Sequence, residues 1–87
     1  MNEETLLQFP CDFPIKIMGQ ATDEFRSLAL GIVCRHFGQL PAERIEERPS
    51  SGGRYLSLTC TVRADSKAQL DAVYQELTSC RQVLVAL

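Results

Sequence analysis

Apolar and polar side chains alternate along two stretches of the chain, and this alternation predicts two long strands. Over residues 13–18 every second side chain is Phe or Ile, until Gly19 ends the pattern. Residues 54–64 show the same period of two more clearly. Such a period is typical of a strand with one buried face. The residues predicted to face inward are Phe13, Ile15, Ile17, Leu56, Leu58, Cys60 and Val62.

Two other stretches carry apolar side chains at intervals of three and four, the spacing of an amphipathic helix. Residues 22–37 form the first, with Thr22 placed to cap its start and Gly38 placed to end it. Ser66 opens the second helix, and Gln69 stands three residues later, at the spacing of a capping box. The apolar face of this second helix consists of Leu70, Val73, Tyr74 and Leu77.

The remaining segments predict two shorter strands and a lead-in. Residues 43–48 are charged, which is typical of a strand at a sheet edge, and residues 49–53 have the composition of a turn. Residues 83–87 predict a last strand. Its two faces would be Val83, Val85 and Leu87 on one side and Leu84 and Ala86 on the other. Residues 1–12 are predicted to be an extended lead-in, in which Leu6, Leu7 and Phe9 dock on the body.

The element order β-α-β-β-α-β predicts an α+β fold of the ferredoxin-like kind. Two right-handed β-α-β crossovers give a four-stranded antiparallel sheet in the order 4-1-3-2, with both helices on one face. All 87 residues are expected to form a single domain. The other face of the sheet would then be open. Its two central strands would expose Lys16, Met18, Tyr55, Ser57, Thr59 and Thr61.

Charge and hydropathy narrow the range of partners. The net charge of −2 gives no basic excess of the kind that nucleic-acid binding needs, so we expect no nucleic-acid partner. The longest apolar stretches are too short to cross a bilayer, and the acidic residues at positions 3 and 4 stand where a signal peptide would be basic. We therefore expect a cytoplasmic protein that does not bind membranes.

No residue set has the pattern of a catalytic or metal site. The single histidine, His36, lies on the apolar stripe of the first predicted helix, where packing explains it better than catalysis. The four cysteines contain no C-x-x-C pair, which disfavours zinc and predicts free thiols in a reducing compartment. These cysteines are Cys11, Cys34, Cys60 and Cys80. We expect no enzymatic activity, no metal and no cofactor.

Three functions known on ferredoxin-like folds lack their required residues here. An acylphosphatase needs an arginine in the loop between the first strand and the first helix and an asparagine on the sheet. That loop, residues 19–22, has no arginine, and the only asparagine is Asn2. A metallochaperone needs a cysteine pair in the same loop. An RNA-recognition module needs several aromatics on its central strands, where this chain offers Lys16 and a lone Tyr55.

Three stretches carry a resemblance to a known family: FPCDFPIKIMGQ (9–20), PSSGGRYLSLTCTV (49–62) and YQELTSCRQVLVAL (74–87). In them the chain resembles the YbeD-like family of small, uncharacterised bacterial proteins, over nearly its whole length. The resemblance implies a ferredoxin-like fold similar to ACT regulatory domains. ACT domains bind amino acids or other small effectors, commonly at dimer interfaces, so the resemblance also allows a small-molecule effector and a dimer.

Two functions stay open at this point. The first is a regulatory or protein-interaction module that uses the open sheet face, either with an unknown protein partner or by self-association. The alternative is a stand-alone ACT-like sensor that binds a small metabolite at Gly19 and Gln20. Backbone amides at the start of a helix can hold an anion there, although a tight turn that needs glycine also explains Gly19.

Overall fold

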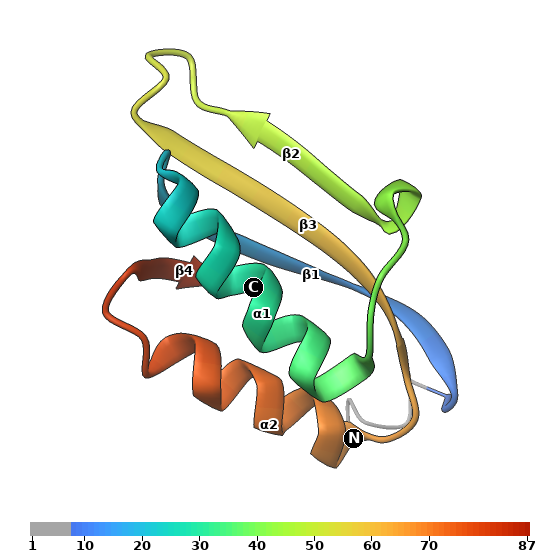
Figure 1. The fold of residues 1–87 in the computed structure, drawn as a ribbon. Coiled ribbons are helices and arrows are strands. Elements are labelled where there is room, and N and C mark those ends of the chain that lie inside the picture. The colour runs from blue at the N-terminus through green and yellow to red at the C-terminus, as the bar shows by residue number, and fades with distance from the viewer. Residues whose placement is uncertain (1–7) are drawn as a thin grey trace, which may run out of the picture.

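The computed structural model describes residues 8–87, which form a four-stranded antiparallel sheet with two helices packed against one of its faces (Figure 1). The predicted ferredoxin-like α+β fold is confirmed. The spatial order β2-β3-β1-β4 is the predicted 4-1-3-2 order read from the other edge. The elements are β1 (Cys11–Gln20), α1 (Asp23–Phe37), η2 (Ala42–Arg44), β2 (Ile45–Pro49), β3 (Tyr55–Ala64), α2 (Lys67–Thr78) and β4 (Val83–Ala86).

The core lies between the helices and the inner face of β1 and β3. The predicted inward residues of these strands are buried, except Phe13 and Leu56, which are only partly buried at the margin. Apolar side chains from one stripe of each helix complete the core. The helical contributors are Phe25, Ala29, Ile32, Val33, Leu70, Val73 and Leu77.

Both predicted helix starts are confirmed by their capping hydrogen bonds. The hydroxyl of Thr22 accepts a hydrogen bond from the backbone N–H of Phe25 at 3.0 Å, and that of Ser66 accepts one from Gln69 at 3.1 Å. Gly38 follows α1 with a φ of 81°, a left-handed conformation that favours glycine. The side-chain oxygen of Gln69 accepts from the backbone N–H of Asp65 at 2.8 Å, one residue earlier than in a standard capping box.

The first strand begins earlier than predicted, at Cys11, although it contains a proline. The N–H of Lys16 donates to the carbonyl of Leu87, so alternate N–H groups of β1 point toward the β4 side. Pro14 lies two residues earlier and its nitrogen points the same way. No described strand pairs with β1 there, so the missing donor breaks no ladder bond. Of the predicted lead-in, residues 1–7, with Leu6 and Leu7, lie outside the described residues, and Phe9 packs against the core.

The predicted faces of the last strand are confirmed for Val85 and Leu87, which share one face, and for Ala86 on the other, but wrong for Val83. Val83 lies opposite Gly19 and is buried, but a register shift between Met18 and Gly19 places Val85 opposite Met18 and Ala86 opposite Ile17. The shift turns Ala86 toward the helices and Val85 toward the open face. Leu87 exchanges two backbone hydrogen bonds with Lys16 and therefore shares the open face with Val85.

Candidate functional site

The open face of the sheet holds all six residues predicted for it. The register of β1 and β3 places Lys16 opposite Thr59 and Met18 opposite Ser57, while Tyr55 lies opposite Gln20. Thr61 follows on the same face, opposite Pro14. Their neighbours along each strand are the buried core residues on the helix side, so the alternation of the two strands fixes which side chains stand on the open face.

The edge strand β2 adds two opposite charges that the sequence reasoning did not assign to this face. Glu46 lies opposite Thr59 and Arg48 lies opposite Ser57, and their side chains are 70% and 80% exposed. The two charged groups lie 4.0 Å apart. The alternate residue Glu47 points to the helix side, where it forms an ion pair with Arg26 of α1.

Apolar side chains gather at the opposite edge of the same face. Among residues 8–87 the large hydrophobic side chains that stay exposed are Met18, Leu84, Val85 and Leu87. Met18 is 40% exposed, Val85 41% and Leu87 71%, and these three lie side by side on the open face. Sequence reasoning missed Val85 and Leu87 because residues 83–87 are all apolar and give no alternation from which to assign faces.

Two shallow hollows mark the open face. One, of about 290 Å³, lies between Met18, Arg48 and Tyr55. The other, of about 200 Å³, lies over Ser57 and Thr59 between Lys16 and Glu46. Pockets for drug-sized ligands are usually about 300–1,000 Å³. Both hollows lie below that range, the first only just, and both lie on the flat face of the sheet, so they suit the side chains of a partner protein.

The corner between β1 and α1 holds Gly19 and Gln20. Gly19 is buried, and a Cβ built on it would come within 3.0 Å of the Phe25 ring and 2.8 Å from the carbonyl oxygen of Gln82. Close packing by Phe25 thus explains the glycine. Gln20 is exposed and lines a hollow of about 300 Å³ beside the start of α1.

That corner hollow contains charged groups of both signs and one orphan acceptor. Glu24 and Arg81 line it, and so does Gln82, whose side-chain oxygen is buried without a hydrogen-bond partner. An unpaired buried oxygen is costly, and a ligand or water that donates to it would remove the cost. The corner therefore remains a candidate small-molecule site.

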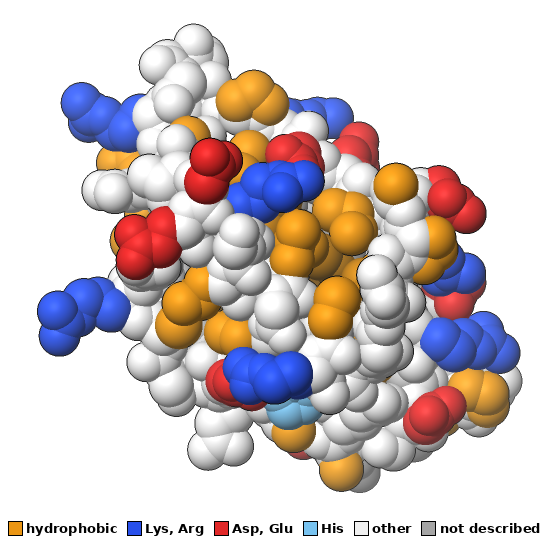
Figure 2. All heavy atoms as spheres, in the orientation of Figure 1, with side chains coloured by type: hydrophobic (Ala, Val, Ile, Leu, Met, Phe, Trp, Pro, Cys, Tyr) orange, Lys and Arg blue, Asp and Glu red, His pale blue; other side chains and the backbone are white. Residues whose placement is uncertain are grey.

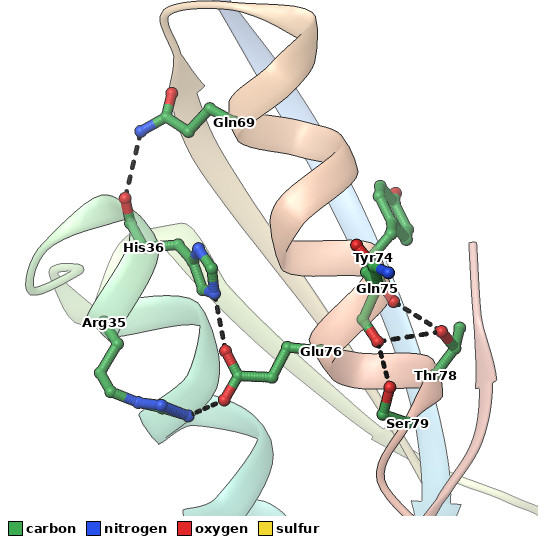
Figure 3. Close-up of polar contacts among 8 residues, drawn as sticks. All are labelled: Arg35, His36, Gln69, Tyr74, Gln75, Glu76, Thr78 and Ser79. Carbon is green, nitrogen blue, oxygen red and sulfur yellow. Dashed lines mark hydrogen bonds and ion pairs between the residues drawn. The ribbon is translucent and has the colours of Figure 1, made fainter.

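His36 has a structural position between the two helices (Figure 3). Its Nε2 lies 2.7 Å from one carboxylate oxygen of Glu76, while Arg35 pairs with the other oxygen. The side-chain amide of Gln69 donates to the backbone carbonyl of His36 at 3.1 Å. These contacts tie the end of α1 to α2. The helix side around them mixes charged groups of both signs with apolar ones (Figure 2).

The cysteines are free thiols, as predicted. Burial, and to a smaller extent the neighbouring Cys34, raises the pKa of the Cys60 thiol to about 11. A thiol of that pKa is a poor nucleophile at neutral pH. Within residues 8–87 no three potential metal ligands lie together, and no described helix is long and apolar enough to span a membrane.

Comparison with known proteins gives a family without an assigned activity. A family described as "Protein of unknown function (DUF493)" matches residues 4–87. The chain is 50% identical over 84 residues to a UPF0250 protein of Paraburkholderia phytofirmans, covering 97% of this chain and 94% of the relative. It is 48% identical over 77 residues to one of Nitrosomonas europaea, covering 88% of each chain. A Neisseria meningitidis relative is 41% identical over 86 residues, with 99% and 94% covered.

Proposed function

Because this chain belongs to the DUF493 family of uncharacterised bacterial proteins, the group that the resemblance to YbeD-like proteins indicated, we propose its function from its surface. The proposal is a non-catalytic regulatory module that binds a protein through the open face of its sheet. One observation carries it: Met18, Val85 and Leu87 stay exposed together on a face that no helix within residues 8–87 covers.

The composition of the open face supports this proposal. Protein interfaces combine an apolar region, in which Met and Tyr are enriched, with a polar rim. Here the apolar edge at Met18 and Val85 meets the half-buried Ser and Thr side chains of β3, and the charges of β2 close the far edge. The open-face side chains of β1 and β3 stand on the two longest strands of the sheet, each of 10 residues, so they are held in place before a partner arrives.

The position of the titratable groups favours binding over catalysis. The single histidine is engaged with Glu76 on the helix side, and Cys60 points into the core. General acid–base and nucleophilic chemistry need such groups near a bound substrate. The open face does carry Lys16, Tyr55 and Glu46, but Glu46 is paired with Arg48 and the two hollows there are shallow, which suits surface recognition better than catalysis.

The experiment is an affinity capture from an extract of the producing cells, with three forms of the protein as bait. Thr59→Arg places a long charged side chain at the centre of the open face, where it should prevent docking. Ala72→Arg is the matched control, because Ala72 is exposed on α2, on the helix side. We expect wild type and Ala72→Arg to retain the same partner and Thr59→Arg to lose it. Equal recovery by Thr59→Arg would refute the proposal.

A second function is favoured by a separate observation, the orphan oxygen of Gln82 in the corner hollow. A small metabolite with a positively charged amine and a carboxylate could use Glu24 and Arg81 together. Such a ligand would raise the melting temperature in proportion to RT ln(1 + [L]/Kd). A panel of amino acids at concentrations up to about 10 mM tests this, since even a millimolar Kd would then give a measurable shift. No shift in wild type, or the same shift in Arg81→Ala, would rule out this site.

A further inference from the structure

We propose that the protein bound by the open face is a second copy of this chain, docked face to face with its strands antiparallel to those of the first. This inference rests on the proposed function, because it assumes that the open face is an interface.

Two neighbouring rows of side chains cross the open face from β2 to β4. The strand register defines both rows. The Glu46 row consists of Glu46, Thr59, Lys16 and Leu87. The Arg48 row consists of Arg48, Ser57, Met18 and Val85.

The two rows match each other residue by residue. Each begins with a charged side chain, of opposite sign in the two rows, continues with a small hydroxyl residue, and ends with an apolar one. The third positions, Lys16 and Met18, are both long and unbranched. The methylene stem of a lysine can pack along an apolar neighbour while its ammonium group reaches solvent.

The proposed two-fold axis lies in the plane of the interface, runs parallel to the rows and passes midway between them. It places the Glu46 row of one copy against the Arg48 row of the second copy, and the Arg48 row of the first against the Glu46 row of the second. Glu46 then faces Arg48 of the second copy, and Arg48 faces Glu46 of the second copy. Leu87 likewise faces Val85. One interface of this kind gives two equivalent ion pairs and a continuous apolar edge, as an isologous dimer requires.

Other face-to-face arrangements oppose like charges or bury charge against apolar groups. An axis through the Glu46 row would bring Glu46 against Glu46 and Lys16 against Lys16, which is repulsive. An axis parallel to the strands would place the charged side chains of β2 over Val85 and Leu87. The charged groups would then lose their hydration without gaining a partner of opposite charge. Of these three arrangements, only the axis between the rows pairs the charges of β2 and keeps the apolar edge together, with the stem of Lys16 packed along Met18 of the second copy.

The size of the face predicts that the dimer is weak. Strands of 10, 10, 5 and 4 residues give a flat footprint of roughly 500 Å² at the usual strand spacing and rise. Stable interfaces bury about 800 Å² on each partner. Self-association should therefore have a Kd in the micromolar range or weaker, at about −8 kcal/mol or less favourable.

The test is sedimentation equilibrium over protein concentrations from about 5 to about 500 μM, which brackets such a Kd. Glu46→Arg places an arginine against Arg48 of the second copy, and the two-fold symmetry repeats this repulsive contact. Arg48→Glu likewise places two carboxylates against each other at both contacts. Each single variant should weaken association by about tenfold or more. The double variant Glu46→Arg/Arg48→Glu restores both ion pairs and should dimerise like wild type. Asp71→Arg, an equal charge change at an exposed position of α2 on the helix side, should have no effect.

Mixing the two single variants gives the sharpest result. A Glu46→Arg chain is positive at both positions and an Arg48→Glu chain is negative at both, so the two variants in an equimolar mixture should form heterodimers more tightly than either forms homodimers. Circular dichroism spectra confirm that each variant is folded. Monomeric wild type at every concentration, or single variants that dimerise like wild type, would overturn the proposal.

The outcomes also separate this inference from the proposed function. Loss of association in Thr59→Arg, combined with no effect of the charge variants, would keep the open face as the interface but refute the antiparallel register. A monomeric wild type whose captured partner is lost in Thr59→Arg would show that the face binds a different protein. No effect of Thr59→Arg on either self-association or capture would refute both.

Discussion

Gly19→Ala tests whether the corner between β1 and α1 is a packing contact. The added methyl group would come within 3.0 Å of two ring carbons of Phe25 and 2.8 Å from the backbone oxygen of Gln82. Phe25 is buried in the core, and Gln82 immediately precedes β4, so neither can move aside freely. Overpacking of this kind costs about 1–3 kcal/mol, a large part of the roughly 4–13 kcal/mol expected for a domain of this size.

The assay is thermal unfolding followed by circular dichroism, with urea unfolding as a second measure. A loss of about 2 kcal/mol should lower the melting temperature by roughly 8–16 °C. Gly31→Ala is the matched control, because a Cβ there meets nothing within 4 Å and the position lies inside α1. It should stabilise the protein by about 0.5–1 kcal/mol through helix propensity.

A double-mutant cycle identifies the contact. Phe25→Leu removes the ring that meets the new methyl group, so Gly19→Ala should cost about 1 kcal/mol less in the Phe25→Leu background. A Gly19→Ala protein that melts within about 2 °C of wild type would refute the packing explanation. The glycine would then need another reason, and a ligand that approaches its backbone would be the first to examine.

Three further predictions concern stability. Thr22→Ala removes the α1 cap and should cost about 1 kcal/mol in urea unfolding, whereas Thr22→Ser should cost little because it keeps the hydroxyl acceptor. Burial raises the pKa of Cys60 from 9.0 to about 11, so the unfolded chain ionises first and stability should fall as pH rises through that interval. Cys60→Val should flatten that part of the profile, and an unchanged slope would contradict the assignment. Tyr74→Phe removes the hydrogen bond from the phenol to the carbonyl of Leu87 at 2.6 Å and should cost about 1 kcal/mol. It should also speed hydrogen exchange at the Leu87 amide, which donates to Lys16.

The sequence predicted those elements whose local pattern is unambiguous. The long strands alternate between apolar and polar residues, and both helices carry an apolar stripe behind a capping hydroxyl. These signals depend only on neighbouring residues. They were sufficient to predict the strand order and the six residues of the open face on β1 and β3.

The features that sequence reasoning missed depend on tertiary structure. The five apolar residues 83–87 do not show where the bulge lies, so the sequence groups Val83 with Val85 and Leu87 although Val83 is buried on the other face. Glu46 and Arg48 looked like any charged edge until the register placed them across from Thr59 and Ser57. The approach of the Phe25 ring to Gly19 has no counterpart in the sequence, because the two residues belong to different elements.

Photocrosslinking in living cells tests the central claim most directly. A photoreactive amino acid replaces Ser57, between the two hollows of the open face, or replaces Ala72 on the helix side as the control. The open-face account predicts a crosslinked product from position 57 and none from position 72, and the mass of that product shows whether the partner is a second copy. No product from position 57, or equal products from both positions, would contradict the account.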